Sequence, residues 1–411
     1  MSLKIFSDGL TRNTLILFIM LGLFNFFNLI YHFIMGRFLS LADYGTLGAL
    51  FTIIYILGVP SEAIQNISAQ ITSHLNFKKE DGKIKNFVKR SLKRGLFFSV
   101  VIFLILAATS IFLSFALKIN FWLIIVTDLF IFLSILTPIS RGVLQGKKKF
   151  FLFGSTFVIE SVSRLGFSLL FVIIGWKVFG AIFGVLLGIF LSFIISLFFI
   201  KNIFKVKEER VEFPGIYGSS VPFFVATLVI ISMMGMDTLF AKIFFDPDTA
   251  GKYVAVSMIG RILFFGTMAV GRTMFPSTAE KFEQDRETSK ILKRSFLIII
   301  LISLVILSFY YIIPETIVSL IYGDKFLDIS PLIIYSGISL VFLSLSNLIL
   351  LYGLATNKLK NSYILFIFPI IEIMAFSLFH NNLMNYILAF MVCNITMFLF
   401  SLLWLNKWQK A

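Results

Sequence analysis

Apolar runs of roughly 18–25 residues recur from one end of this sequence to the other, separated by charged or turn-rich breaks. Each run is long enough, at about 1.5 Å of rise per residue, to carry a helix across a hydrocarbon layer about 30 Å thick. Hydrophobic residues make up 58% of the chain and charged residues only 14%, so a water-soluble core could not hide the apolar surface. Because a bilayer offers no water to backbone polar groups, the runs predict transmembrane helices. We therefore expect an all-α, polytopic membrane protein.

The breaks divide the chain into two predicted halves of six spans each. We expect an N-terminal six-helix bundle over residues 1–205 and a C-terminal six-helix bundle over residues 206–411. The first apolar run is too long for a cleaved signal peptide, so the first span should be retained. The predicted spans cover residues 12–35, 44–75, 95–117, 121–145, 150–174, 178–200, 217–243, 250–275, 295–313, 329–353, 361–379 and 383–405.

Lysine and arginine residues gather on one set of loops, the set that also holds both chain ends. Basic loops mark the cytoplasmic side of a membrane, so we expect a cell-membrane protein with both termini in the cytoplasm. Residues 78–94 form a strongly basic segment with two open interpretations, an amphipathic helix on anionic headgroups or an ordinary solvated loop. The alternate loops carry only Arg37, Lys118, Lys177, Lys242, Lys252 and Lys325.

Two short segments resemble each other about half a chain apart. Residues 37–45 read Arg-Phe-Leu-Ser-Leu-Ala-Asp-Tyr-Gly, and residues 242–251 read Lys-Ile-Phe-Phe-Asp-Pro-Asp-Thr-Ala-Gly. Both are predicted outer loops with acidic residues just before the next helix, where a carboxylate stabilises the helix N-terminus. The likeness suggests an internal duplication, which in transporters usually means two halves around a central site.

Charged side chains inside spans are costly in lipid, so each needs a partner or water and is a candidate for function. Glu160 and Arg164 lie four positions apart on one helical face, where a structural pair and a functional site are equally good interpretations. Arg261 and Arg272 lie eleven positions apart, which predicts a cationic stripe on one face of a single span. A guanidinium fork suits phosphate, so we expect an anionic ligand, although Arg272 could instead reach lipid headgroups.

Polar residues keep helical spacing in three predicted spans, and such stripes line either water or a neighbouring helix. They are Asn25, Asn28 and His32 in the first span, Glu62, Asn66 and Ser73 in the second, and Ser336, Ser339, Ser346 and Asn347 in the tenth. For the serines we favour hydrogen bonds between helices, and for Glu62 and the asparagines a sugar-binding or hydrated lumen. The substrate-binding candidates are Arg261, Arg272, Arg164, Arg141, Asn25, Asn28 and Asn66.

Asp128, Asp237 and Glu372 are isolated acids in three further spans. A carboxyl group in a cavity whose hydration changes can take up and release H⁺ or Na⁺. An arginine or lysine partner from another span would remove that role. The ion-coupling candidates are Asp237, Glu62, Glu160 and Asp128.

Three other features have structural interpretations. Residues 246–248, Asp-Pro-Asp, match a metal-binding motif of sugar transferases, but they lie on a short loop and are expected to cap a helix. Residues 66–68, Asn-Ile-Ser, match a glycosylation acceptor but fall inside a span. The single cysteine, Cys393, is expected to be a buried thiol, and the three scattered histidines suggest no metal site. We expect no cofactor and no nucleic-acid partner.

Several stretches share the character of a known family. They are Gly-Arg-Phe-Leu-Ser-Leu-Ala-Asp-Tyr-Gly at 36–45, Val-Pro-Ser-Glu-Ala-Ile-Gln-Asn at 59–66, Arg-Gly-Val-Leu-Gln-Gly at 141–146, Gly-Met-Asp at 235–237, Ala-Gly-Lys-Tyr at 250–253 and Phe-Pro at 275–276. Together they resemble the polysaccharide-transporter, or O-antigen flippase, family of the multidrug/oligosaccharidyl-lipid/polysaccharide exporter superfamily. The resemblance implies two six-helix bundles around a central cavity, alternately open to each side, that move an isoprenoid-diphosphate-linked oligosaccharide outward. It also implies a cationic lumen for the diphosphate and no catalytic signature.

The partners expected on this basis are the lipid-linked oligosaccharide, membrane lipids, H⁺ or Na⁺ as candidate coupling ions, and glycan polymerase machinery. A multidrug exporter of the same superfamily is the nearest alternative, but it would need an acidic lumen. A membrane glycan polymerase or ligase generally needs a large external loop, and the outer loops here are short. A lipid scramblase or scaffold has no positive feature in the sequence. We hypothesise that Arg261→Ala abolishes export without harming folding, and normal export by that variant would remove Arg261 from the site.

Overall fold

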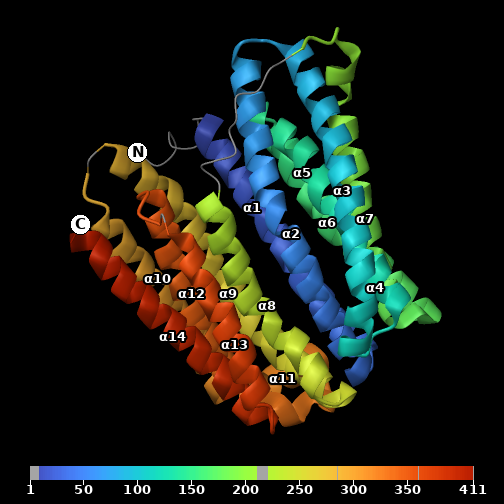
Figure 1. Cartoon of the computed structure of the whole chain (residues 1–411), viewed down its shortest axis with the longest axis vertical. Helices are drawn as coiled ribbons and strands as arrows, with labels where there is room; N and C mark the ends of the chain where they lie inside the picture. Colours follow the sequence, from blue (N-terminus) through green and yellow to red (C-terminus); the bar gives the residue numbers. More distant parts are fainter. Residues whose placement is uncertain (1–8, 211–220, 285, 360, 411) are drawn as a thin grey trace. The chain divides into compact units, whose positions relative to one another are not determined.

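The computed structural model describes residues 9–210, 221–284, 286–359 and 361–410. Within these residues every regular element is helical, and ten helical stretches are long and apolar enough to cross a membrane (Figure 1). The predicted all-α, multi-pass membrane fold is therefore confirmed. The predicted start of the seventh span at residue 217 lies outside the described residues. Helix α8 (Val221–Phe244) is the first described element after that point.

The chain forms two compact units that exchange one segment. Unit 1 comprises Met1–Leu39 and Ile53–Gly218, and unit 2 comprises Ser40–Thr52 and Ser219–Ala411. The long helix α2 (Leu41–Phe77) therefore contributes its first part to unit 2 and its remainder to unit 1. The predicted halves, residues 1–205 and 206–411, did not include this exchange.

Unit 1 contains one helical stretch, Phe150–Phe199, that is too long for a single crossing. Its 50 residues would extend about 75 Å if straight, against a hydrocarbon layer of about 30 Å. The stretch is broken at Gly175, whose φ of +100° is a conformation that favours glycine. Two spans result, as the sequence predicts. Unit 1 holds α1 (Gly9–Phe38), most of α2, α3 (Asp81–Leu117), α4 (Phe121–Asp128), α5 (Phe130–Gly146), α6 (Phe150–Phe171), η2 (Val172–Trp176), α7 (Lys177–Phe199) and η3 (Lys201–Lys205).

Helices α6 and α7 pack closely because α7 presents a row of glycines at four-residue intervals. A Cβ on Gly184 would overlap Ser168, and a Cβ on Gly188 would lie 2.6 Å from the backbone nitrogen of Arg164. Small residues at this spacing let helix backbones approach in membrane proteins. The glycines therefore fix where α6 holds Arg164.

The end of unit 1 that carries the basic loops has an apolar core of its own. Ile84, Phe87 and Val88 of α3 pack there with residues of α2, α5 and α6 and with Ile200 and Ile203. The chain after η3 then lies along α3, since the backbone nitrogen of Glu209 donates to the Gly82 carbonyl oxygen over 3.2 Å. Residues 78–94 are therefore a loop followed by the start of a packed helix, not a separate amphipathic helix on the membrane surface.

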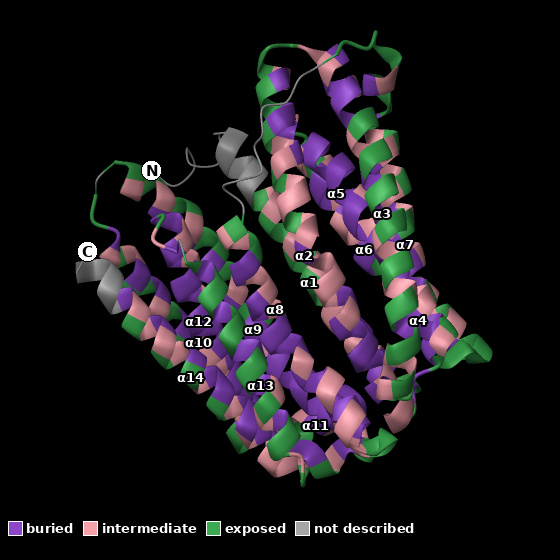
Figure 2. Ribbon diagram, in the orientation of Figure 1, coloured by how far each residue is buried: buried purple, intermediate pink, exposed green. Residues whose placement is uncertain are grey.

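Unit 2 is built around α12 (Ile333–Ala355), which packs on α9 (Pro247–Glu283), α10 (Ser289–Ile312) and α14 (Leu383–Lys410). Figure 2 shows buried residues along these helices. The shorter apolar stretch Ser362–Leu378, together with the two spans within Phe150–Phe199, completes the twelve predicted spans. The remaining elements are α8, α11 (Pro314–Tyr322), η5 (Asp324–Leu332), η6 (Ser362–Phe366) and α13 (Ile367–Leu378).

The two glycines that align in the predicted repeat meet inside unit 2. A Cβ on Gly45 would lie 2.8 Å from the backbone nitrogen of Gly251, and a Cβ on Gly251 would overlap the carbonyl oxygen of Leu41. One helix turn later, a Cβ on Gly48 would overlap the side chain of Val254. The first part of α2 thus crosses α9 at a backbone contact that only glycine permits.

Candidate functional site

Unit 1 buries two arginines around one glutamate. Arg141 donates from Nη2 to Glu160 Oε2 over 2.6 Å, and Arg164 donates from Nη2 to Glu160 Oε1 over 2.7 Å. The Glu160–Arg164 pair is the one that the four-residue spacing predicts, whereas Arg141 joins from another helix. We call Arg141, Glu160 and Arg164 the arginine cluster. With two guanidinium groups and one carboxylate, the cluster carries a formal charge of +1.

Arg141 is held on every side. Its Nε donates to Thr156 Oγ1 over 3.1 Å, and its Nη2 donates to Ser192 Oγ over 2.8 Å. Its guanidinium carbon lies 3.9 Å from the centre of the Phe157 ring, within cation–π range. Since Arg141 lies on α5, Thr156 on α6 and Ser192 on α7, this arginine ties three helices together.

Arg164 has fewer partners and more exposure. Besides Glu160 it donates from Nη1 to Asn28 Oδ1 over 2.7 Å, which brings α1 to the cluster. Its Nε is buried and has no hydrogen-bond partner among the described residues. Its side chain is 12% exposed, against 9% for Arg141. Arg164 is therefore the cluster member with donor capacity left for a ligand.

Unit 2 buries a second ion pair with balanced charge. Arg261 donates from Nη2 to Asp237 Oδ1 over 2.9 Å and to the Met234 carbonyl oxygen over 2.8 Å. The side chains of Arg261 and Asp237 are 1% and 0% exposed. The sequence suggested no carboxylate for Arg261 within its own helix, and the partner comes from α8. Arg261 is therefore enclosed in unit 2, and its predicted role as a substrate-binding residue stays a prediction.

Hydroxyl groups complete the surroundings of Asp237. Tyr253 and Ser257 donate to its Oδ2 over 3.1 and 2.5 Å. Tyr386 of α14 donates to the Asp237 backbone carbonyl oxygen over 2.7 Å. Both Asp237 and Glu160 thus pair with an arginine from another span, and such a partner argues against uptake of H⁺ or Na⁺ by the carboxylate.

Arg272 does not share a site with Arg261. The eleven residues between them correspond to about 16 Å along α9. Arg272 is exposed whereas Arg261 is fully buried. One phosphate group cannot contact both side chains in this arrangement. The two arginines therefore lie in separate environments and do not form the predicted cationic stripe.

Two isolated acids differ in their contacts. Asp128 accepts a hydrogen bond from Ser110 Oγ over 2.6 Å. Glu372 of α13 is fully buried, and neither of its carboxyl oxygens has a hydrogen-bond partner among the described residues. An uncompensated charge buried in such surroundings would be very costly.

The polar stripes of the first two spans are exposed in unit 1. Asn25, Glu62, Asn66 and Ser73 are exposed, whereas Asn28 is bound to Arg164. Polar side chains at membrane depth avoid lipid and instead face water or protein. This surface is consistent with the hydrated lumen predicted for Glu62 and the asparagines, whose binding roles stay predictions.

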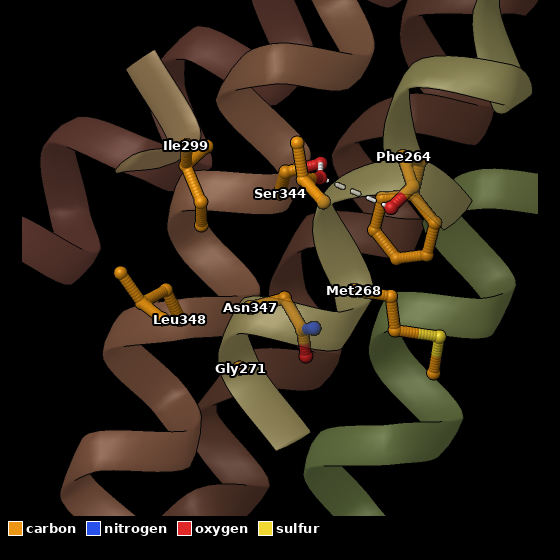
Figure 3. A pocket seen from close by; sticks show the side chains of 8 residues that line it. Phe264, Met268, Gly271, Ile299, Ser344, Asn347 and Leu348 are labelled. Carbon is orange, nitrogen blue, oxygen red and sulfur yellow. Dashed lines mark hydrogen bonds between the residues drawn. The ribbon is translucent and has the colours of Figure 1, made fainter. Parts of the chain in front are cut away.

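Of the α12 serines named in the sequence, only Ser339 makes the predicted bond between helices; Ser346 donates to the Phe342 carbonyl oxygen of its own helix, and Ser336 Oγ has no hydrogen-bond partner among the described residues. Asn394 of α14 donates to Ser339 Oγ over 2.9 Å, and Thr267 of α9 donates to Ser344 Oγ over 3.0 Å. Figure 3 shows the narrow gap beside the latter pair, which is too small for a water molecule. It is lined by Phe264, Thr267, Met268, Gly271, Ile299, Ser344, Asn347 and Leu348. This gap cannot hold a substrate in the present structure.

The Asp-Pro-Asp segment caps a helix, as predicted. Asp246 accepts from the backbone nitrogens of Asp248 and Thr249 at the start of α9, and Pro247 occupies the first helical turn. Hydrogen bonds to the Asp246 carboxylate, mainly from the side chain and the backbone of Thr249, hold the pKa of Asp246 below its usual value. Cys393 is buried, also as predicted, and no cluster of metal-ligating side chains occurs in the described ranges.

Sequence reasoning missed the hydroxyl partners of both buried arginine sites. Ser192 binds from another helix, but Thr156 lies one turn before Glu160 on α6, and Tyr253 and Ser257 lie two turns and one turn before Arg261 on α9. This four-residue spacing puts them on the face of the charged residue and was an available signal. A second signal in unit 1 was the glycine spacing 180, 184, 188, which marks a helix–helix contact beside Arg164.

A protein-family model described as "Polysaccharide biosynthesis protein" matches residues 34–331, which is more than half of the chain. The chain belongs to this family. Comparison with curated proteins finds no match. The family match confirms the resemblance seen in the motifs, and it spans both arginine sites.

Solved structures with the same fold are transporters of the MOP superfamily. An inward-facing multidrug-resistance MATE transporter is similar with a TM-score of 0.74 and 13% identity, covering 94% of this chain and 95% of its own. The lipid II flippase MurJ, in an inward closed conformation, is similar with a TM-score of 0.70 and 14% identity, covering 95% of this chain and 87% of its own. These likenesses establish the fold shared with both.

Proposed function

We propose that this protein is a flippase that moves an isoprenoid-diphosphate-linked oligosaccharide from the cytoplasmic to the outer leaflet of the cell membrane by alternating access, with both termini in the cytoplasm. No bond is made or broken in this process, so the protein acts as a transporter and not as an enzyme. Membership of a polysaccharide biosynthesis family favours a glycan cargo. A similar fold in a protein described as a lipid II flippase supports lipid transport.

The arginine cluster carries the proposal. A surplus positive charge at membrane depth is costly unless an anion compensates it. A diphosphate supplies that charge, and its oxygens accept hydrogen bonds from guanidinium groups in the favoured geometry. Arg164, with an unused buried donor and partial exposure, is the group that we assign to the diphosphate.

The exposed polar surface of unit 1 suits the glycan. Asn25 lies one helical turn from Asn28, which bonds Arg164, so an amide group that can bind sugar hydroxyls lies close to the proposed diphosphate site. Asn66 and Glu62 add an amide and a carboxylate on α2. Amides and carboxylates together can donate to and accept from sugar hydroxyls.

Coupling to H⁺ or Na⁺ remains part of the proposal. Among the predicted ion-coupling residues, Asp128 has a hydroxyl partner in place of a cation. An Asp128→Asn variant that flips at a normal rate, whether or not an ion gradient is imposed, would remove Asp128 from that role.

The proposal is tested by flipping of a fluorescent isoprenoid-diphosphate oligosaccharide in proteoliposomes. We expect protein-dependent flipping, reduced about 10- to 100-fold in Arg164→Gln, because a hydrogen bond to a charged group contributes about 1.5–3 kcal/mol. Arg286→Gln, which removes an exposed loop arginine, is the matched control and should flip normally. Absence of flipping, combined with ion-driven export of ethidium-like cations, would instead assign the chain to the multidrug exporters.

A further inference from the structure

Helix α3 is much longer than a membrane crossing, and its exposed face changes character part-way. Its 37 residues extend about 55 Å, of which the apolar part from Gly95 onward is sufficient to span the hydrocarbon. Only 11% of its most apolar window is buried inside the protein, so this helix faces lipid along most of its length (Figure 2). The part before Gly95 extends into the headgroup region and beyond.

The exposed face is apolar and then abruptly basic. Phe97, Leu104 and Phe112 are 64%, 62% and 73% exposed along one side of α3. On the same side of α3, the two helical turns just before Gly95 expose four basic residues, Lys89, Arg90, Lys93 and Arg94. We call these four residues the α3 basic stripe. Spacings of three and four residues connect Arg90 through Arg94 to Phe97, so the stripe directly continues the lipid-facing surface.

The stripe is built on a fixed support. The opposite face of the helix, at Ile84, Phe87 and Val88, is fully or almost fully buried in the apolar core of this end of unit 1. Lys85 Nζ donates to the Val206 carbonyl oxygen over 2.6 Å, which fastens the chain after η3 beside the helix. The helix therefore cannot rotate to move the four basic side chains away from lipid.

Lys93 and Arg94 of the stripe have no ion-pair partner among the described residues. Lys89 and Lys93, and likewise Arg90 and Arg94, are like-charge pairs four positions apart, an arrangement that destabilises a helix. The acidic partner recorded for the stripe is Glu208, which pairs with Lys89 over 2.8 Å. This pairing holds the pKa of Glu208 below its usual value, so the carboxylate stays charged. The positive surplus of the stripe therefore rests on Lys93 and Arg94.

We propose that the α3 basic stripe is a binding site for the phosphate headgroups of anionic membrane phospholipids. Basic residues at the end of an apolar helix face meet headgroups directly, and each attracts anionic lipid. The neighbouring exposed residues, Leu96, Phe97 and Phe98, suit acyl chains and offer no hydrogen-bonding group to sugar hydroxyls, which favours bulk phospholipid over a glycan-bearing lipid. This inference does not rest on the proposed flippase activity.

The test compares lipid retention by three forms of the purified full-length protein in native mass spectrometry with added phosphatidylglycerol or phosphatidylcholine. In the stripe variant, Lys89, Arg90, Lys93 and Arg94 are all changed to glutamine. In the control variant, the exposed loop residues Lys78, Lys79, Lys148 and Lys149 are changed to glutamine, which removes the same charge from outside the stripe.

We expect the wild type and the control variant to retain phosphatidylglycerol over phosphatidylcholine, and the stripe variant to retain roughly tenfold less phosphatidylglycerol. If both variants lost phosphatidylglycerol equally, retention would depend on total charge and not on the stripe, which would overturn the proposed site. Displacement of the lipid by inorganic pyrophosphate would show a free phosphate site, and displacement by polyglutamate a protein-docking surface; either result also overturns the proposal. Unchanged circular dichroism and thermal midpoint confirm that the stripe variant is folded.

Discussion

The arginine cluster of unit 1 and the Asp237–Arg261 pair of unit 2 are both buried in membrane-spanning helices, yet they differ in charge balance. In unit 2 one guanidinium meets one carboxylate, and hydroxyl groups occupy the second carboxyl oxygen. In unit 1 two guanidinium groups share one carboxylate, and the Arg164 side chain is 12% exposed against 1% for Arg261. The difference favours a structural role for the Asp237–Arg261 pair and supports the proposal that the arginine cluster binds a ligand.

The largest effect should follow from breaking the balanced pair. Arg261→Ala leaves the Asp237 carboxylate buried without a cation and should lower the free energy of unfolding by about 3–5 kcal/mol. The structure thus changes the expectation that this variant folds normally. Chemical unfolding in detergent measures the loss, and the double variant Arg261→Ala/Asp237→Ala should recover part of it. A single variant as stable as wild type would show that Arg261 does not hold unit 2 together.

Removing the carboxylate of unit 1 should separate stability from binding. Glu160→Gln leaves Arg141 and Arg164 facing each other without a counter-charge, which should cost about 3 kcal/mol of stability. Added isoprenoid diphosphate should restore more stability to this variant than to wild type, because the cluster then carries one more positive charge. Thermal midpoints measured with and without the diphosphate test this. An equal ligand effect in both proteins would contradict an anion site at the cluster.

Gly188 on α7 and Gly166 on α6 offer a matched pair of substitutions near Arg164. Gly188→Ala places a Cβ against the Arg164 backbone and should cost about 1–3 kcal/mol by overpacking. Gly166→Ala, where a Cβ would meet nothing within 4 Å, should instead stabilise the helix by about 0.5–1 kcal/mol. Unfolding free energies of the two variants should therefore have opposite signs relative to wild type, and equal signs would show that the α6–α7 contact is not close.

The smallest effect concerns the cap of α9 in unit 2. Asp246→Ala removes two hydrogen bonds to backbone nitrogens and should cost about 1 kcal/mol. Because the pKa of Asp246 is lowered in the folded protein, the cap stabilises fully above the ordinary aspartate pKa, and this contribution is lost as pH falls through the lowered value. Wild type and variant should therefore converge in stability at acid pH. A constant difference across pH would contradict an ionised cap.

The sequence predicted the helices well because apolar run length is a local property. The break at Gly175 and the cap at Asp246 also follow from nearby residues. The exchange of Ser40–Thr52 into unit 2 could not be predicted in the same way, since it depends on the contact of Gly45 with Gly251 across the chain. The repeat alignment paired these glycines without indicating that they touch.

The buried sites were predicted only where partners share a helix. The spacing of Glu160 and Arg164 was sufficient for that pair. Arg141 and Glu160, or Asp237 and Arg261, lie on different helices, and their pairing depends on packing that a single sequence does not specify. The cost of leaving a charge unpaired in lipid was a valid reason to expect partners, but it did not say which ones.

The proposed binding of a diphosphate by the surplus guanidinium of unit 1 is tested most directly by ligand binding. The measurement is the affinity of purified wild type and Arg164→Gln for a short isoprenoid diphosphate and for the corresponding uncharged isoprenoid alcohol. We expect wild type to prefer the diphosphate and Arg164→Gln to weaken diphosphate binding about 10- to 100-fold while leaving the alcohol unaffected. Equal diphosphate affinity in the two proteins would contradict the proposal.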